Sequence, residues 1–156
     1  MRFTLATCLP SPAEQVWAEV QTSRLMVTII KPWVYFAPLD PPVLPAVWTP
    51  GAYRGRMSLW GVIPFGEHTI RISFPKIDRP DEYQVLDNGG GQIVARWDHR
   101  IIIRRLDHGH TLYVDQVDIA AGWLTPLVWL YAQGYYRYRQ RRWRRLIRAR
   151  FDYSQF

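Results

Sequence analysis

The chain has one cysteine, two lysines and no long hydrophobic run. A lone Cys8 excludes a disulfide framework and a cysteine-built zinc site. The longest apolar runs, such as Leu25–Ile30 and Ile101–Ile103, are far shorter than the roughly 20 residues that span a bilayer, so no transmembrane segment is expected. Met1–Thr4 does not begin a basic leader followed by an apolar stretch, so no signal peptide is expected and a reducing, cytoplasmic location is the default.

The composition is that of one folded domain over residues 1–156. Hydrophobic residues make up 48% of the chain, which excludes a disordered protein. Aromatic residues are abundant, with eight Trp, nine Tyr and six Phe. Because this is more ring surface than a small core needs, it indicates an aromatic-lined cavity or interface.

The positive charge is concentrated in one segment. The chain carries a net charge of +7, and eight arginines lie within Arg137–Arg150, so the remainder of the chain carries −1. Three interpretations stay open for this segment: a solvated helix end, which we favour, contact with anionic lipid headgroups, and binding of nucleic acid. Nucleic acid ranks last because no broad basic face accompanies the segment.

The first third of the chain predicts a strand and two short helices. Apolar and small residues alternate over Arg2–Leu9, as in a strand. Ser11 is expected to cap a helix that has Pro12 at its first position, and a second short helix ends at Pro32. Lys31–Pro50 contains six prolines, which exclude a long helix or a central strand there.

The rest of the chain predicts antiparallel strands and a closing helix. Five segments have the composition and alternation of strands: Tyr53–Trp60, Glu67–Phe74, Glu82–Asp87, Ile93–Leu106 and His110–Ile119. A turn is expected at Asn88–Gly91, and Trp123–Phe151 has helical periodicity. The predicted fold class is α+β: a curved antiparallel sheet that grips the long C-terminal helix and leaves a cavity near two short helices.

Three motifs carry a resemblance to a known superfamily. They are Ser11–Trp17 (S-P-A-E-Q-V-W) at the first helix, Trp97–His99 followed by Thr111 and Asp115, and Tyr136–Arg142 (Y-R-Y-R-Q-R-R). In this order and spacing the chain resembles the START-like, or SRPBCC, helix-grip superfamily, in particular a bacterial ligand-binding subgroup.

The resemblance implies a cavity that holds an apolar or amphipathic small molecule. The superfamily includes lipid carriers, hormone receptors, and polyketide cyclases or aromatases, and the fold does not choose among them. Members of the subgroup often carry a second histidine where this chain has Ile101, so a role that needs paired histidines is in doubt. No cofactor is expected, because Gly89–Gly91 lacks the strand-before, helix-after setting of a dinucleotide fingerprint.

The predicted hairpin around Asp107–Gly109 places candidate residues on one face. With a three-residue loop, Ile101 opposes Asp115 and His99 opposes Val117. A two-residue loop would shift the register by one and turn Gln116 inward instead. We prefer the three-residue loop, which puts these residues on the concave face: Trp97, His99, Ile101, Tyr113 and Asp115.

The polar residues of this face have two interpretations. His99 and Asp115 could orient a ligand or serve as acid and base, or they could form a buried hydrogen bond with no further role, which we rate slightly higher. The neighbouring strand adds an inward set: His68, Ile70, Ile72 and Phe74. A metal site is not expected, because no paired-histidine spacing is present.

The C-terminal helix has an apolar stripe that includes Leu127, Leu130, Tyr131, Tyr135 and Tyr138. We expect this stripe to cover the sheet, with the three tyrosines either facing the cavity or serving as core aromatics. Beyond Tyr138 arginines interrupt the stripe, so the helix is expected to extend past the sheet.

The sequence therefore predicts binding or carriage of a hydrophobic small molecule, such as a lipid or polyketide, without catalysis. The alternative is a cyclase- or dehydratase-type enzyme in which His99 and Asp115 act as acid and base.

Overall fold

The computed structural model describes residues 1–107 and 109–156. In chain order its elements are β1 (Arg2–Leu9), α1 (Ala13–Val20), α2 (Ser23–Ile30), β2 (Val34–Asp40), β3 (Gly51–Leu59), β4 (Ile63–Ser73), β5 (Glu82–Gly91), β6 (Arg96–Arg105), β7 (Thr111–Ala120), α3 (Thr125–Arg148) and a final 3₁₀ turn, η1 (Tyr153–Gln155). The seven strands form one antiparallel sheet in the order β1-β7-β6-β5-β4-β3-β2.

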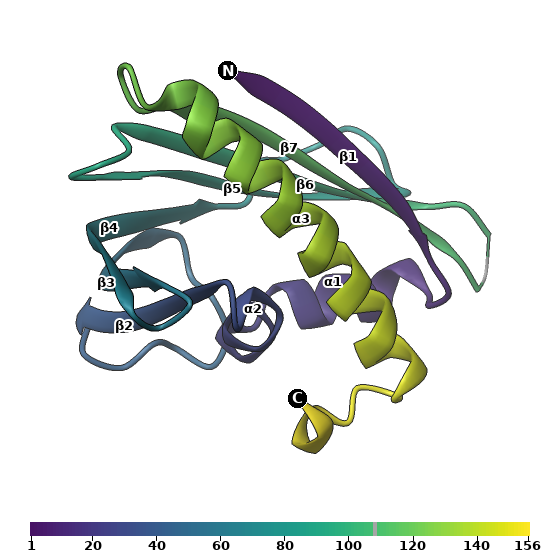
Figure 1. Ribbon diagram of the computed structural model, residues 1–156. Helices are drawn as coiled ribbons and strands as arrows, with labels where there is room; N and C mark the ends of the chain where they lie inside the picture. Colours follow the sequence, from purple (N-terminus) through teal and green to yellow (C-terminus); the bar gives the residue numbers. More distant parts are fainter. Residues whose placement is uncertain (108) are drawn as a thin grey trace.

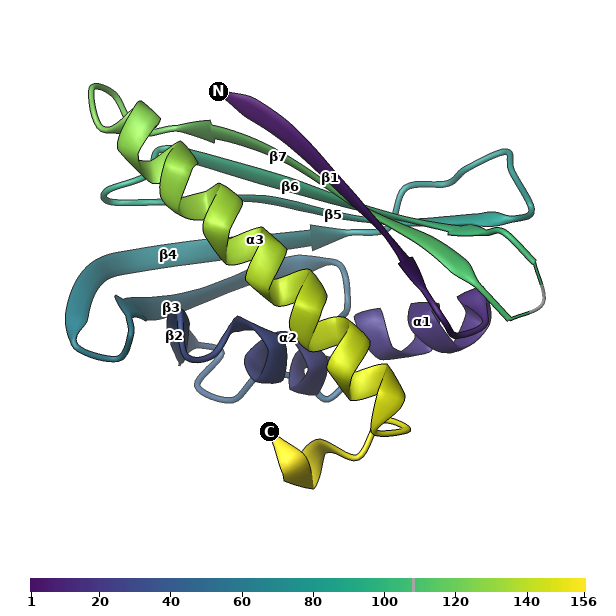
Figure 2. The ribbon, with the colours of Figure 1, turned by 45° about the vertical axis from the view of Figure 1, so that its right-hand side comes forward.

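The long helix α3 lies across one face of this sheet (Figure 1). The short helices α1 and α2 lie beside its C-terminal half, and α2 packs against it directly. In Figure 2, β2 and β3 lie on the same side of the molecule as α2, away from β1 and β7. The predicted fold class, a curved antiparallel sheet with a long C-terminal helix and two short helices after the first strand, is confirmed.

The β6–β7 hairpin has the predicted register. Ile101 pairs with Asp115, and His99 pairs with Val117. Every second residue of β7 is buried from Thr111 onward, so the strand turns one continuous row of side chains toward α3. The loop that sets this register includes His108, which lies outside the described residues.

Two glycine- and proline-rich segments take different roles in the sheet. Pro38 lies in β2, which is tolerated because β2 is an edge strand with one neighbour, β3.

The turn expected at Asn88–Gly91 is wrong, because β5 continues to Gly91. A Cβ atom at Gly89 would lie 2.7 Å from the backbone oxygen of Thr69, so the missing side chain allows a close approach of β4 to β5.

The start of the chain follows its alternating pattern. Phe3 and Leu9 are buried, and Cys8 on the other face of β1 is exposed. The expected Ser11 cap is wrong: α1 begins at Ala13 with Pro12 as its N-cap. The Ser11 hydroxyl bonds the Gln15 side chain instead, so it does not satisfy the free backbone N–H groups of the helix.

The buried face of α3 differs from the predicted stripe. Leu127 and Leu130 are 66% and 65% exposed. The residues that face the sheet are spaced three or four apart along a different line: Val128, Ala132, Tyr135, Tyr136, Arg139, Trp143 and Leu146. Beyond Tyr138 the helix remains part of the core, because Trp143 and Leu146 are fully buried.

Candidate functional site

A cavity of about 120 Å³ lies between α3, α2 and the sheet. Its wall is mostly apolar and aromatic, with polar groups supplied by His68, Asp87, His99 and Arg139. The helix α2 contributes Leu25 and other apolar side chains because its buried stripe faces inward. An apolar wall with a few placed polar groups is a composition typical of small-molecule sites.

Most of the residues predicted from the sequence line this cavity. The structure brings together eight of them: His68, Ile70, Ile72, Trp97, His99, Ile101, Tyr131 and Tyr135. They come from β4, β6 and α3, three elements that are far apart in the sequence.

Four predicted residues lie elsewhere. Phe74 packs edge-on against Trp17, with ring centroids 5.7 Å apart. Tyr138 stacks on Trp33, and its hydroxyl donates to the backbone oxygen of Lys31. Tyr113 and Asp115 are fully buried and do not line the cavity.

Asp115 is the centre of a buried polar cluster. Its Oδ1 lies 2.7 Å from Nε2 of His99, and its Oδ2 accepts from Nε2 of Gln140 at 2.8 Å. The guanidinium of Arg139 lies 3.7 Å from Oδ1 and donates to the Tyr113 hydroxyl at 3.3 Å. Asp115 therefore holds His99 and α3 in place from behind the cavity wall.

The charges of this cluster follow from its geometry. Burial raises the pKa of Asp115, but the charge of Arg139 and the hydrogen bond from His99 together hold it below its ordinary value. Burial and the charge of Arg139 lower the pKa of His99. Neutral His99 therefore donates from Nε2 to an ionised carboxylate, and Asp115 and Arg139 offset each other's charge.

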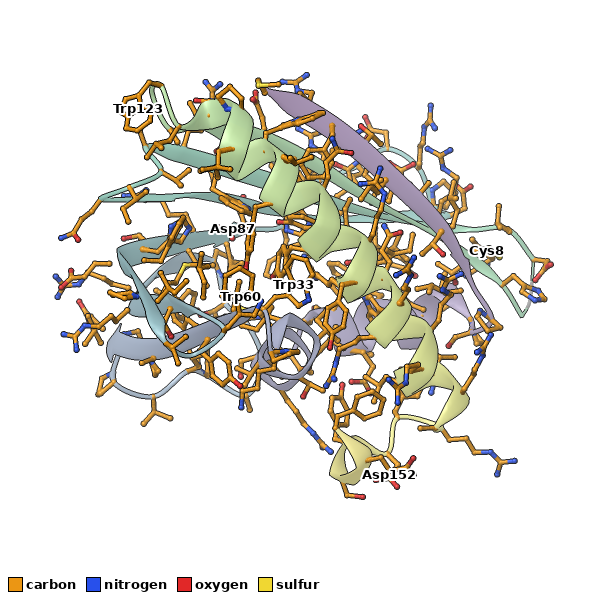
Figure 3. The ribbon with its side chains drawn as sticks, in the orientation of Figure 1. Cys8, Trp33, Trp60, Asp87, Trp123 and Asp152 are labelled. Atoms are coloured by element: carbon orange, nitrogen blue, oxygen red, sulfur yellow. The ribbon has the colours of Figure 1, made fainter. Side chains whose placement is uncertain are left out.

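Asp87 is a cavity residue that the sequence analysis did not single out as a site residue. It lies on β5 opposite His99, and its Oδ1 accepts from the backbone N–H of Arg71 at 2.8 Å. Burial raises its pKa to about 7. Figure 3 labels it in the space between α3 and the sheet. The signal that could have found it is its position two residues after Val85, at the end of the predicted strand Glu82–Asp87 and on the same face as Val85.

His68 is the second polar group on this side. A Cβ atom at Gly89 would lie 3.1 Å from both His68 Nε2 and Asp87 Oδ1, so the two side chains flank one point. Burial lowers the pKa of His68 to about 4, which keeps the imidazole neutral at physiological pH. Within residues 1–107 and 109–156, no group of three His, Cys, Asp or Glu side chains could hold a metal ion.

The outer face of α3 and the residues just before and after the helix carry two kinds of exposed side chain. Near its N-terminal end Trp123, Leu127 and Leu130 are exposed, and Figure 3 shows Trp123 pointing away from the body of the protein. Further along, five arginines of the basic segment are exposed: Arg137, Arg141, Arg145, Arg148 and Arg150. Among the described residues, none of these five forms an ion pair with an acidic side chain. No helix in the described part of the chain is long and apolar enough to cross a membrane.

Comparison with solved structures identifies the fold. A START superfamily protein from Mycobacterium smegmatis is 13% identical, with a TM-score of 0.62 over 92% of this chain and 94% of that one. A protein from Thermus thermophilus is 12% identical, with a TM-score of 0.63 over 96% and 98%. The Zhui aromatase/cyclase from a Streptomyces species is 16% identical, with a TM-score of 0.53 over 78% and 68%.

No protein-family model matches the sequence, and no curated protein matches it. The fold is nonetheless the START-like helix-grip fold, because more than nine-tenths of the chain superimposes on the Mycobacterium and Thermus structures. At such low identity the likeness shows the fold alone, so function has to be argued from the cavity.

Proposed function

We propose that this protein binds and carries a hydrophobic or amphipathic small molecule, of the size of a lipid or polyketide fragment, in the cavity between the sheet and α3. The observation that carries this proposal is the cavity itself. Protein interiors are packed as densely as organic crystals, so an apolar space of about 120 Å³ is uncommon in a well-folded core. Apolar cavities of similar size accept a ring-sized guest.

The wall suggests how a larger ligand is accommodated. Met26 and Met57 line the cavity, and methionine side chains change rotamer at low cost. A ligand longer than one ring displaces such side chains, while Ile70, Ile72 and Ile101 provide a fixed apolar surface. Burial of the ligand's apolar surface supplies the affinity, at about 25 cal/mol per Å² before the costs of association.

A substitution in the wall tests the proposal. Trp97 lines the cavity and donates from its indole N–H to the Tyr136 hydroxyl at 3.0 Å. We expect Trp97→Arg to weaken binding of N-phenyl-1-naphthylamine, a neutral fluorescent probe, by about tenfold or more, because a guanidinium in an apolar wall is costly. Fluorescence titration measures the change.

The matched control is Trp123→Arg, on a side chain that is 89% exposed and does not line the cavity. It should leave the titration unchanged. Unchanged probe affinity in a folded Trp97→Arg protein, or no probe binding by the wild type, would count against a ligand site here. Native mass spectrometry of gently purified protein should also show a bound apolar adduct.

The alternative function, a cyclase- or dehydratase-type enzyme, receives less support from the geometry. Acid and base have to reach the same substrate, and only His99 of the proposed pair lines the cavity. Asp115 is fully buried behind it, hydrogen-bonded to His99 and Gln140 and ion-paired with Arg139. The His99–Asp115 pair is therefore better explained as a positioning device than as separate acid and base.

We further propose that the outer face of α3 contacts anionic lipid headgroups from a cytoplasmic location. Two features of the same face support this: the exposed arginines, and the exposed apolar side chains of Trp123, Leu127 and Leu130. Together they provide electrostatic attraction and apolar surface, which membrane-surface helices combine. Contact of this kind would bring the cavity close to a source of apolar ligands.

Sedimentation with vesicles tests the headgroup contact. We expect binding to phosphatidylcholine vesicles that contain phosphatidylglycerol, and little binding to phosphatidylcholine alone or at high salt. Replacing Arg137, Arg141 and Arg145 with Gln should weaken binding on the order of a hundredfold, at about 1 kcal/mol per arginine. Arg54→Gln, an exposed arginine of β3, is the control. Equal sedimentation with both vesicle types would leave these arginines as a solvated helix end.

A further inference from the structure

Asp87 is the carboxyl group of the cavity wall, and the nearest charges that favour its ionised form are those of Arg139 and Arg71. Arg139 has Asp115 at 3.7 Å, burial lowers the pKa of His68, and burial together with the charge of Arg139 lowers the pKa of His99, so both imidazoles are neutral. Among the described residues, Asp87 forms no ion pair with Lys, Arg or His. A half-buried carboxylate without an ion-pair partner keeps part of its desolvation cost, so a cation bound in the cavity would stabilise it.

The sheet holds the Asp87 carboxyl in position. Between the pairs Thr69–Gly90 and Ile72–Asp87 the β4–β5 ladder has no residue pairs, and Asp87 Oδ1 accepts the Arg71 N–H in this gap. Gly89 leaves room for the carboxyl and for His68. The position of Asp87 is therefore set by the sheet before any ligand arrives.

The cavity wall as a whole is rich in aromatic rings, and Tyr135 is close enough to Asp87 for their charges to interact. Trp48, Phe65, Trp97, Tyr135 and Tyr136 all line the same space. The negative face of an aromatic ring attracts a cation, and a desolvated site strengthens that attraction. A carboxylate among aromatic rings is a chemical environment that recognises ammonium groups.

We propose that the polar end of the ligand is a protonated amine, which pairs with the Asp87 carboxylate among the aromatic rings. This inference rests on the proposed function of ligand binding. An amine leaves the cavity neutral, because Arg139 is offset by Asp115 and the ligand offsets Asp87. An anionic ligand would instead add a second negative charge beside Asp87.

Binding of the amine is coupled to the protonation of Asp87. The groups around its carboxyl are His68 and the Arg71 N–H on β4, His99 and Asp98 on β6, and Arg139 and Tyr135 on α3. The free protein holds Asp87 with a pKa of about 7, and the amine requires its ionised form. Affinity should therefore fall about tenfold for each pH unit below 7 and level off above it.

Calorimetric titration with three phenyl compounds tests the proposal. We expect 2-phenylethylamine to bind about tenfold or more tightly than 2-phenylethanol at pH 7.5, and 3-phenylpropionate to bind most weakly. At pH 7 the amine should release about half a proton, seen as a dependence of the heat on buffer ionisation. Asp87→Asn should bring the amine to within about twofold of the alcohol and abolish the proton release.

Asp107→Asn is the matched control. Asp107 is exposed in the β6–β7 loop and does not line the cavity, so its loss should leave the preference for the amine intact. Thermal unfolding of both variants checks that they are folded, and the proton release of the wild type provides a readout that needs no variant. If the alcohol binds as well as the amine, the amine inference is wrong and the ligand site stands. If none of the three compounds binds, the proposed function itself is contradicted.

Discussion

Replacing Asp115 with leucine is expected to lower the free energy of unfolding by about 3–5 kcal/mol. Asp115 has no exposure, and Arg139 is 7% exposed. The substitution leaves the Arg139 guanidinium buried without a counter-charge, and it removes the acceptor of His99 and Gln140. Urea denaturation followed by tryptophan fluorescence measures the loss.

The double variant Asp115→Leu with Arg139→Met separates charge from packing. Because it removes both charges, it should recover more than half of the stability lost by Asp115→Leu alone. A single variant that loses less than about 1 kcal/mol would mean that the pair is not buried as described. A double variant as unstable as the single one would assign the loss to packing.

Trp143→Ala is expected to cost about 3–5 kcal/mol of unfolding free energy. Trp143 has no exposure, and its ring packs edge-on against Tyr113 and Phe151 at 5.9 and 6.3 Å. Removal of the indole leaves a cavity, because the rigid neighbouring rings cannot collapse to fill its volume. The midpoint of urea denaturation should shift accordingly.

Trp123→Ala is the matched control, because this tryptophan is 89% exposed. Its effect should stay within about 0.5 kcal/mol. Comparable losses for the two variants would contradict the burial of the arginine-rich half of α3. A large loss confined to Trp143 would show that this half of the helix is part of the core, in spite of its charge.

The β6–β7 hairpin was predictable in detail because a strand pair follows local rules. The loop length sets the register, and the side chains then alternate with a period of two residues. His99 and Asp115 could therefore be placed on one face from the sequence. Their hydrogen bond at 2.7 Å is diagonal to the strand pairing, and the register alone does not specify it.

The face of α3 could not be predicted in the same way. The sequence contains a row of apolar residues at helical spacing that includes Leu127 and Leu130. The row of residues that is buried in the structure is a different one, and it includes Arg139. Burial of an arginine is acceptable only where a carboxylate meets it, and that carboxylate is Asp115, which lies on β7 in another part of the chain. Helical periodicity carries no information about such a distant partner.

Asp87 could not be identified as a site residue from the sequence for the same reason. The glycines after it indicate a turn by composition, and only the neighbouring strand reveals that they let β4 approach β5. The cavity wall likewise combines side chains of α2, β2 and β3. The proline-rich segment Lys31–Pro50 contains β2 and links α2 to β3, and local propensity does not specify how it places these elements side by side.

The amino-acid sequence alone was enough to establish the order of all elements except the edge strand β2, the α+β class, the hairpin register and most of the cavity residues, because these depend on periodicities of about two to four residues. The tertiary structure decided which face of α3 is buried, that Arg139 belongs to the core and that Asp87 faces the cavity. Each of these depends on a charged side chain or a backbone group of a distant segment. A buried charge is stable only when such a partner lies beside it.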